Sequence, residues 1–566
     1  MTALRRCTDL SSLSPPPALL ARLSTAASDL LQMRKYGSRK EGDEGGLRNG
    51  RSGSGSRPGF IDRSSWRYFD SRKVGIPPGA IPRNCWTVLQ MLKRNGFEAY
   101  LVGGCVRDLL LKRAPKDFDV ITTASLKQIK KKVFKRCLIV GRRFPICLVK
   151  MHGATFEVSS FSTNPTQVKG SEQINCSEEL EGDDQGDILR WKNSLKRDFT
   201  VNSLFFNPFN FRVYDYVNGV MDLRKNKLCT VIPAHVSFKE DSARILRAMR
   251  VAARLGFQFS SETSTAIRDL SPSIINIDKA RLGLEMKYML SHGAAESSVR
   301  LLRKYGLLDI LLPFQAAYLS DQMKGRSSDR GLMLMKLLAN LDKIFSADRP
   351  CHSSLWLALL AFHSALVNSP QDVQVIKAFA ALMHFGTWDS AIEFSEQDVG
   401  GPATFVPEAP GPSGAGPDDL MKQTSELASL VNSSVGTLTC LDTLRESLAR
   451  YSEASESSGV VFVSAKERSR VLGIFQGLDS DISSYDAGRG MHGIDYRLLD
   501  EGNTGEVRFV LGQVILDTMR DESPRVSTDD AAASTDDAAA LKRPAAEDLA
   551  DGDHHLLSSL FKRGKS

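Results

Sequence analysis

Residues 100–120 read YLVGGCVRDLLLKRAPKDFDV, and this stretch decides the fold. It carries two adjacent glycines, Gly103 and Gly104, and two aspartates, Asp117 and Asp119, which flank a single phenylalanine. Side chains two residues apart on a β-strand point to the same face. We therefore expect the two carboxylates to project together while the phenylalanine points into the core. Two like charges held this close cost free energy unless a cation neutralises them.

The acidic pair predicts a site for magnesium ions. Magnesium is a hard ion that prefers carboxylate oxygens and the phosphates of substrates. Two such ions, roughly 4 Å apart, activate an attacking hydroxyl and stabilise the leaving oxygen of an in-line displacement. A third carboxylate on a neighbouring strand would complete the ligands, and Glu157 in TFEVSSF is the candidate. The alternative is a pair of acids on a solvated strand face, which for an isolated DxD is the commoner case.

The glycine pair stands where the pattern predicts a junction between a strand and a helix. Without Cβ atoms the backbone can approach a phosphate closely, and the amides at a helix N-terminus favour anions. An ordinary tight turn is the alternative interpretation. Arg107 and Asp108 follow directly, and we expect them to form an ion pair that orients the loop.

The length of 566 residues predicts two to four domains, at roughly 100–200 residues per domain. Residues 41–80 are rich in Gly, Ser, Arg and Pro and are interpreted as a linker, so the ordered part is expected to begin near Ile81. An amphipathic helix is expected at 85–97 and a basic helix at 126–135. From about residue 236 the apolar spacing is helical.

Several other segments have a recognisable character. Residues 117–123 are expected to form a strand, and residues 136–161 two or three strands. Residues 164–187 are polar and acidic and are interpreted as a loop. A Pro/Gly linker is expected at 400–420, and the last residues, which repeat STDDAAA, are interpreted as disordered.

The net charge of +8 is unevenly distributed. Residues 101–155 contain 13 Lys or Arg and 3 Asp or Glu, which fits either a solvated face or a surface that binds a polyanion. No run of apolar residues is long enough for a membrane span. The 9 cysteines are scattered without a CxxC pair, which indicates neither a zinc site nor a redox pair and fits a reducing compartment.

Residues 1–60 are rich in Ser, Arg, Ala, Leu and Gly and contain few acids. This composition resembles an organelle transit peptide and predicts import into a plastid or a mitochondrion. A disordered tail is the alternative, and it would leave the protein in the nucleus or the cytoplasm.

The opening stretch closely resembles the head signature of the class II nucleotidyltransferases of the polymerase-β superfamily. This family contains tRNA CCA-adding enzymes and bacterial-type poly(A) polymerases. Four further segments resemble its motifs in the family's order. They are KRDFTVNSLFFNP (196–208), DYVNGVMDL (215–223), EDSARILRAMRVAARLGF (240–257) and ARLGLEMKYML (280–290). Together the matches span roughly residues 95–315.

The resemblance implies an α+β fold, with a polymerase-β-like nucleotidyltransferase head followed by an all-helical neck, body and tail. Together with the composition of the two ends, the expected bounds are 1–80 for the transit-peptide-like segment and linker, 81–225 for the head, 226–315 for the neck, 316–520 for the body and tail, and 521–566 for a disordered tail. The neck would bind nucleotide and RNA, and the helical half would hold the RNA by shape and charge.

The resemblance also implies roles for individual residues. Asp117, Asp119 and Glu157 would hold two Mg²⁺ ions, for which Mn²⁺ could substitute, and the two aspartates would be catalytic. Asp241 and Arg244, interpreted as i and i+3 on one helix, would read the edge of the incoming base; a surface ion pair is the alternative. The implied nucleotide contacts are Gly103, Gly104, Arg107, Arg197, Asp198, Asn202, Asp241, Arg244 and Arg247.

Two departures from the family pattern are visible. Lys196 stands where relatives have a first arginine, which keeps the charge but loses the bidentate geometry. Asn218 stands where many relatives have glycine, and asparagine tolerates the left-handed conformation that such a turn needs.

One segment bears on the product. IVGRRFPICLV (139–149) resembles a signature of bacterial-type poly(A) polymerases, in which Arg142 and Arg143 would grip RNA or triphosphate. Lys130 and Lys131 on the basic helix would bind RNA phosphates. We therefore expect addition of AMP from ATP to the 3′ end of an mRNA fragment or a tRNA. A CCA-adding enzyme and a catalytically inactive RNA-binding protein are the alternatives; no contact with a membrane is indicated, and no protein partner can be named.

Overall fold

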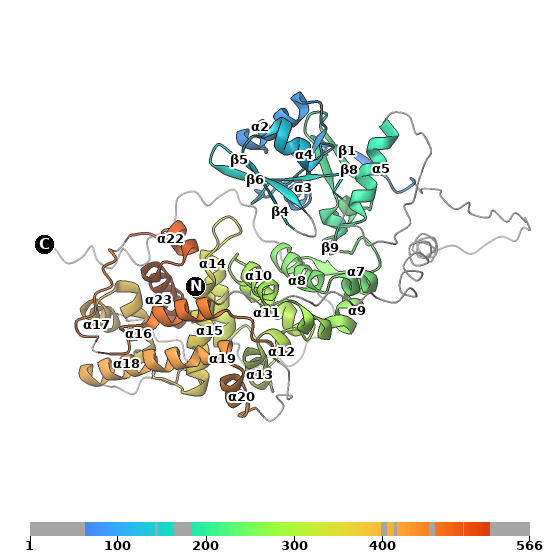
Figure 1. The fold of residues 1–566 in the computed structure, drawn as a ribbon. Coiled ribbons are helices and arrows are strands. Elements are labelled where there is room, and N and C mark those ends of the chain that lie inside the picture. Colours follow the sequence, from blue (N-terminus) through green and yellow to red (C-terminus); the bar gives the residue numbers. More distant parts are fainter. Residues whose placement is uncertain are drawn as a thin grey trace, which may run out of the picture. The chain divides into compact units, whose positions relative to one another are not determined.

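The computed structural model describes residues 63–77, 79–141, 145–163, 183–397, 405–411, 416–451, 459–480, 482–490 and 492–520. A sheet with covering helices forms the first part of the described chain, and the remainder is helical (Figure 1). This arrangement confirms the expected fold class. The predicted transit-peptide segment and the tail beyond residue 520 lie outside the described residues. In the described ranges, no helix combines the length and the apolar character needed to span a membrane.

The head is built on one mixed sheet of eight strands in the spatial order β1-β8-β7-β2-β3-β6-β5-β4. The strands are β1 Arg67–Asp70, β2 Ala99–Val102, β3 Val120–Thr122, β4 Cys137–Val140, β5 Ile146–Met151, β6 Ala154–Ser160, β7 Phe205–Asn207 and β8 Arg212–Asp215. In this sheet β3 and β6 run parallel and the other pairs run antiparallel. A separate parallel pair joins β9 Lys227–Leu228 to β10 Gln258–Phe259.

Several helices pack against this sheet or connect its strands. They are α2 Arg83–Arg94, α3 Gly104–Leu110, α4 Leu126–Gln128, the π-helix η1 Ile129–Val133, α5 Asp183–Ser194, the 3-10 helix η2 Thr200–Asn202 and α6 Gly219–Arg224. The predicted amphipathic helix corresponds to α2. The predicted basic helix corresponds to α4 and η1, and a capping box between Ser125 and Gln128 begins it. Its lysines are exposed because η1 buries only Ile129 and Val133.

An aromatic core lies between the sheet and α5, and a buried arginine organises it. Arg190 donates to the hydroxyl of Tyr216 (2.7 Å) and of Tyr100 (2.6 Å), and its guanidinium lies 4.2 Å from the ring centroid of Tyr214. Asp187, one turn earlier on α5, accepts from the same guanidinium at 2.7 Å. A buried charge is tolerated only when it is paired and hydrogen-bonded, so this network fixes α5 against the sheet.

The expected start of the ordered head near Ile81 is wrong. Strand β1 pairs with β8, with Tyr68 opposite Tyr214, and Trp66 is only 8% exposed in the aromatic core. A strand of four residues gives little local signal, and its pairing partner lies far along the sequence. The expected loop at 164–187 is wrong at its end, because α5 begins at Asp183. The rest of that predicted loop lies outside the described residues.

The chain from Ala234 onward is helical, as the spacing predicted. The helices are α7 Ala234–Glu240, α8 Ala243–Leu255, α9 Ser261–Leu270, η3 Ser271–Asn276, α10 Lys279–Leu290, α11 Ala295–Lys304, α12 Leu308–Leu311, α13 Pro313–Gln322, α14 Met333–Ile344, α15 Ser353–Asn368, α16 Val373–Phe385, α17 Trp388–Gln397, α18 Pro417–Ser434, α19 Gly436–Thr439, α20 Leu441–Leu448, α21 Ala465–Phe475, α22 Tyr496–Glu501 and α23 Thr504–Arg520. The expected linker at 400–420 is wrong at its end, where α18 has already begun.

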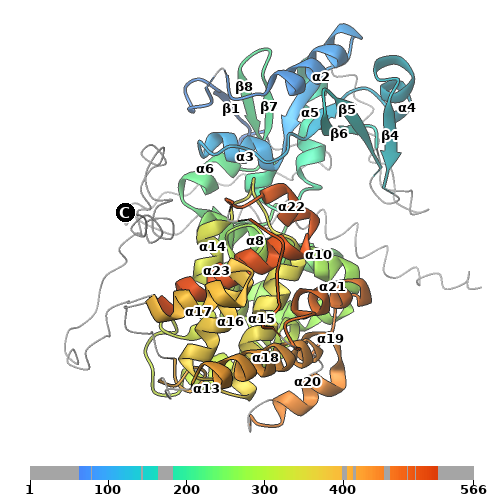
Figure 2. The same ribbon diagram turned by 90° about the vertical axis from the view of Figure 1, so that its left-hand side faces the viewer.

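Helix α15 is buried along almost its whole length, and α16 packs against both α18 and α23 (Figure 2). This burial explains why α15 is apolar on all sides rather than on one face. The residues up to Arg520 belong to one compact unit. The division of the helical part into neck, body and tail stays a prediction.

The turn before α6 holds η2 in place. Asn218 adopts the left-handed conformation (φ 63°), as predicted, and the buried carboxylate of Asp215 accepts from the amides of Val217, Gly219 and Val220. A Cβ at Gly219 would lie 2.3 Å from the carbonyl oxygen of Thr200, the first residue of η2. Only glycine permits this approach.

We predict that Gly219→Ala lowers the free energy of unfolding by about 1–3 kcal/mol, because α6 and η2 must separate to admit the methyl group. Urea denaturation measures the change. Gly473→Ala is the matched control, since nothing lies within 4 Å of a Cβ there and alanine favours the helix. Equal stability of Gly219→Ala and the wild type would contradict the described packing.

Candidate active site

The two aspartates stand directly before β3, in the segment that joins α3 to the sheet. Phe118 is 9% exposed, Asp117 is exposed and Asp119 is partly buried. The predicted alternation of side chains is therefore confirmed, although the assigned strand begins only at Val120. The backbone of Asp119 is nevertheless held by the sheet, because its carbonyl oxygen accepts from the amide of Val102 at 3.1 Å.

The parallel pairing of β3 and β6 brings the third carboxylate to the same place. Val120 is paired with Val158, so the residues that precede them, Asp119 and Glu157, are neighbours across the two strands. Burial and the charges of Glu157 and Asp117 raise the pKa of Asp119 to about 6, against the lowering influence of Arg197. Burial and the charge of Asp117 also raise the pKa of Glu157. The three carboxylates thus repel one another.

The donor set fits a hard divalent cation in chemistry. Carboxylate oxygens are the ligands that magnesium prefers, and an ion would remove the repulsion that raises the pKa of Asp119. Within the described ranges, however, no three His, Cys, Asp or Glu side chains are close enough to count as a preformed metal site. The assignment of Asp117, Asp119 and Glu157 as metal ligands therefore stays a prediction. The structure shows that the charges of these carboxylates act on one another.

Gly103 lies next to Asp119 and Arg197. It has a φ of 76°, a conformation that other residues rarely adopt. A Cβ at this position would lie 3.2 Å from Nη1 of Arg197 and 3.7 Å from Oδ2 of Asp119. The missing Cβ of Gly103 therefore leaves space beside a guanidinium and a carboxylate, through which a phosphate oxygen could approach the backbone. Gly104 begins α3, and a Cβ there would lie 3.5 Å from Nη2 of Arg107.

Arg107 connects α3 to η2. Its guanidinium is buried and pairs with Asp108 (Nη2 to Oδ1, 2.7 Å), which confirms the predicted ion pair. Nη1 of Arg107 also donates to Oδ1 of Asn202 at 2.7 Å, and Nδ2 of Asn202 donates to Oδ1 of Asp198 at 3.1 Å. These bonds give Arg107 and Asn202 a structural role, and their predicted contact with nucleotide stays a prediction.

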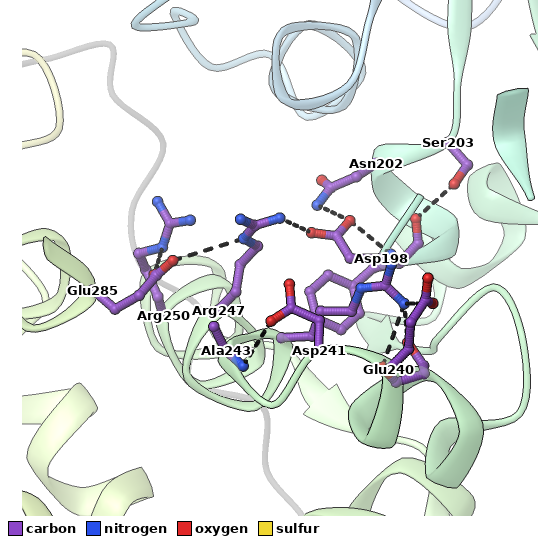
Figure 3. A network of polar contacts seen from close by, with 12 residues as sticks. Asp198, Asn202, Ser203, Glu240, Asp241, Ala243, Arg247, Arg250 and Glu285 are labelled. Carbon is purple, nitrogen blue, oxygen red and sulfur yellow. Dashed lines mark hydrogen bonds and ion pairs between the residues drawn. The ribbon is translucent and has the colours of Figure 1, made fainter. Parts of the chain in front are cut away.

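Asp198 connects the head to the helices. Its Oδ2 accepts from Nη1 of Arg247 on α8 at 3.0 Å (Figure 3). Burial acts to raise the pKa of Asp198, but the Arg247 guanidinium and hydrogen bonds from Asn202 and the Phe199 amide hold it below its ordinary value. Arg247 was predicted to contact nucleotide, and in the structure it pairs with Asp198 and approaches Glu285.

Glu285 on α10 extends this network (Figure 3). It is 4% exposed, and its two oxygens lie 3.8 Å from Nε of Arg247 and 3.0 Å from Nε of Arg250. Glu285 lies in the segment ARLGLEMKYML, but no role was predicted for it. Its signal was the glutamate at a fixed place in the ARLGLEMKYML motif.

The prediction that Asp241 and Arg244 share a helix face is wrong. Helix α7 ends at Glu240 and α8 begins at Ala243, so Asp241 lies between the helices with extended geometry (φ −151°). Its Oδ1 accepts at 3.2 Å from the amide of Ala243, the first residue of α8. The helical spacing of the segment hid this break, because both flanking turns are helical.

The two predicted base readers are engaged separately. Nη2 of Arg281 on α10 donates to Oδ2 of Asp241 at 2.6 Å, and Nη1 of Arg244 donates to Oε2 of Glu240 at 2.9 Å. Partial burial acts to raise the pKa of Asp241, but Arg281 holds it below its ordinary value. Asp241 is therefore a charged acceptor. Arg281 is a residue that the sequence analysis missed.

The remaining predicted site residues divide into three groups. Arg197 is partly buried and faces Asp119 and Asp198, and its burial lowers the pKa of the guanidinium despite these two acids. Lys130 and Lys131 are exposed on η1, as a surface that binds RNA requires. Arg142 and Arg143, and with them the centre of the product signature, lie outside the described residues.

The chain is similar to known families in two segments between residues 99 and 319. Residues 99–229 match the family model of the Poly A polymerase head domain. Residues 256–319 match a model described as the probable RNA and SrmB-binding site of polymerase A.

Individual relatives cover the same part of the chain. Poly(A) polymerase I of Haemophilus influenzae is 38% identical over 250 residues, which are 44% of this chain and 55% of that protein. A CCA-adding enzyme of Geobacillus kaustophilus is 31% identical over 226 residues, which are 40% of this chain and 53% of that protein. The chain thus spans somewhat more than half of the length of these curated relatives. A solved CCA-adding enzyme of Bacillus stearothermophilus in complex with CTP is 20% identical, with a TM-score of 0.38, over 75% of this chain and 98% of its own.

We predict that Asp119→Asn stabilises the metal-free protein while removing a ligand. With a pKa of about 6 against the ordinary 3.8, ionising Asp119 costs the folded chain about 3 kcal/mol more than the unfolded chain. The wild type therefore loses this stability as the pH rises from about 4 through 6. In EDTA at pH 7.5, urea denaturation should show Asp119→Asn to be more stable by about 3 kcal/mol, and the difference should vanish near pH 4.

Asp117→Asn is the control for this experiment. Asp117 is exposed, so solvent already stabilises its charge and the substitution should change the stability by less than about 0.5 kcal/mol. A destabilised Asp119→Asn at pH 7.5 would show that the carboxylates are not in conflict.

Proposed function

Because the chain carries the head domain of the poly(A) polymerase family, we propose that it is a nucleotidyltransferase that adds AMP from ATP to RNA 3′ ends without a template. The observation that carries the proposal is the group of Asp117, Asp119 and Glu157, which the pairing of β3 with β6 brings together and in which burial and neighbouring carboxylates raise the pKa of Asp119.

The metal would be held by the three carboxylates. Two magnesium ions, or manganese in their place, would lower the pKa of the RNA 3′-hydroxyl and stabilise the charge on the leaving pyrophosphate. The protein's own part is to present Asp119 and Asp117 from the edge of β3 and to exclude a side chain at Gly103, so that a phosphate can approach the backbone. Arg197 lies next to Asp119 and supplies positive charge for that phosphate.

Selection of the base is assigned to Asp241 and Arg244. The carboxylate accepts from the exocyclic amino group of adenine, and the guanidinium donates to a ring nitrogen. Both groups already have protein partners, Arg281 and Glu240, which fix their orientation. The selection of ATP would therefore depend on side chains that are preorganised before the nucleotide enters.

The comparisons support one product over the other. The similarity to poly(A) polymerase I is higher and longer, at 38% over 250 residues, than that to the CCA-adding enzyme, at 31% over 226 residues. This difference favours a run of adenosines as the product. The second candidate is the CCA-adding reaction, because both kinds of relative match the same head.

RNA would bind through phosphate contacts to the exposed lysines of η1, including Lys130 and Lys131.

We predict that the purified protein with Mg²⁺ extends an unstructured RNA with ATP alone, by many adenosines, and uses CTP poorly. Denaturing gels of labelled RNA, supplied with each nucleotide in turn, measure this. A tRNA that lacks its terminal CCA is the second substrate. Ordered addition of two C and one A to that tRNA only would replace the proposal with the CCA-adding reaction.

The matched variants separate chemistry from binding. Asp119→Ala should reduce AMP incorporation by about a thousandfold or more, since the metal site loses a ligand. Asp70→Ala removes a carboxylate of the same head, on the distant strand β1, and should leave the rate unchanged. A wild-type rate of AMP incorporation in Asp119→Ala would show that Asp119 is not a ligand of the catalytic metal.

A further inference from the structure

A second cluster of like charges lies where the segment between α3 and β3 meets α8 and α10. Its cationic members are Arg113, Lys116, Arg250, Arg254 and Lys287. Nη1 of Arg113 donates to the carbonyl oxygen of Arg254 at 3.3 Å. Nζ of Lys116 lies 3.5 Å from Nε2 of His292 and 5.9 Å from the ring centroid of Tyr288. The head thus contributes two cations and the helices contribute three.

The nearby carboxylates are already engaged. Asp108 lies 3.9 Å from Arg254, but it is paired with Arg107 at 2.7 Å. Glu285 is shared between Arg247 and Arg250. Asp348 acts on Arg254 only at longer range. No acid among the described neighbours of Arg113 and Lys116 forms an ion pair with either of them.

The electrostatic consequences appear on two groups. Burial, together with the charges of Arg107, Arg250 and Arg113, lowers the pKa of Arg254 against the influence of Asp108. Burial and the charges of Lys116, Arg254 and Lys287 lower the pKa of His292 to about 4. His292 is 6% exposed. Because its pKa is about 4, its ring is neutral at pH 7. Positive potential accumulates at this junction.

A purely structural role does not account for this cluster. Charges that hold two parts of a chain together have opposite signs, whereas here Arg113 lies against the backbone of the cation Arg254, and the charges of Lys116 and Lys287 both act on His292. An anion between these cations would lower their repulsion. Arg250 and Arg254 keep 26% and 28% of their side chains exposed, and Arg113 and Lys116 are exposed, so a large ligand can reach them.

We propose that Arg113, Lys116, Arg254 and Lys287 bind a phosphate group that bridges the head and the helices. The ligand is a phosphate of the RNA strand or of the nucleotide. Arginine and lysine together suit this anion, because the guanidinium fork binds two oxygens and the ammonium acts as a point charge. Lys116 directly precedes Asp117, so this site and the carboxylates belong to the same segment before β3. The inference rests on the proposed function only in that the ligand is a nucleic acid or a nucleotide.

The test uses the full chain with Arg113→Gln and Lys116→Gln combined. Neither side chain forms an ion pair among the described residues, so the variant should fold, and urea denaturation without ligand should show equal or higher stability. The control, Lys73→Gln with Lys112→Gln, removes the same charge from exposed positions of the same head. Binding is measured without turnover, in EDTA, so failure of the catalytic proposal would not affect it.

Two probes distinguish the two sources of phosphate. The first is a labelled oligoadenylate of about 15 nucleotides, followed by fluorescence anisotropy between about 50 and 200 mM salt. If the site holds the RNA strand, the dissociation constant should rise about tenfold and the slope of log affinity against log salt should fall by about 1–2. The second probe is inorganic tripolyphosphate, followed by thermal shift. If the site holds the nucleotide, only this stabilisation should be lost.

Either loss, relative to the control variant, supports the phosphate site and names its ligand. If both probes bind the cluster variant and the control variant equally, the cluster binds no phosphate and the proposal is overturned. If the wild type binds RNA but incorporates no AMP, the proposed function fails while the site stands.

Discussion

The ion pair between Asp198 and Arg247 is the contact on which the rest of the site depends. Asp198 is 8% exposed, and a buried carboxylate is stable only when it is paired and hydrogen-bonded. Its partners lie on different elements, because Asn202 connects it to Arg107 on α3 while Arg247 connects it to Glu285 on α10. Residues from the head and from the helices are therefore positioned by one continuous set of charges, and a change at any member leaves a buried charge without compensation.

On either side of this network, charges of the same sign lie close together. Asp117, Asp119 and Glu157 repel one another at the edge of β3, whereas the cations around Arg254 and Lys116 repel one another at the junction with α8 and α10. In the network between them, the charges are paired. The group of carboxylates suits metal ions, and the group of cations suits phosphates. A nucleotide or an RNA end with bound magnesium contains both metal ions and phosphates. The fold alone does not impose this arrangement, since ordinary packing would avoid both kinds of repulsion.

The sequence predicted the features that depend on neighbouring residues. The burial of Phe118 between two aspartates follows from strand alternation, and the left-handed turn at Asn218 follows from what asparagine tolerates. Features that depend on distant pairing were missed or misplaced. Trp66 and the strand that follows it need a partner almost 150 residues away, and Arg190 needs three tyrosines, one on β2 and two on or directly after β8. Asp241 was assigned to a helix because helical spacing persists across a break of two residues.

The most direct test of this account is a double-mutant cycle on Asp198→Asn and Arg247→Gln, measured on the free energy of unfolding and on the kcat/KM for AMP incorporation. Removing one partner leaves the other buried and uncompensated. The losses of stability in the two single variants should therefore add up to more than the loss in the double variant. We expect a coupling energy of about 1–3 kcal/mol in stability and a matching coupling in the rate. Additive effects in both measurements would show that head and helices are not joined through this pair, and would contradict the account.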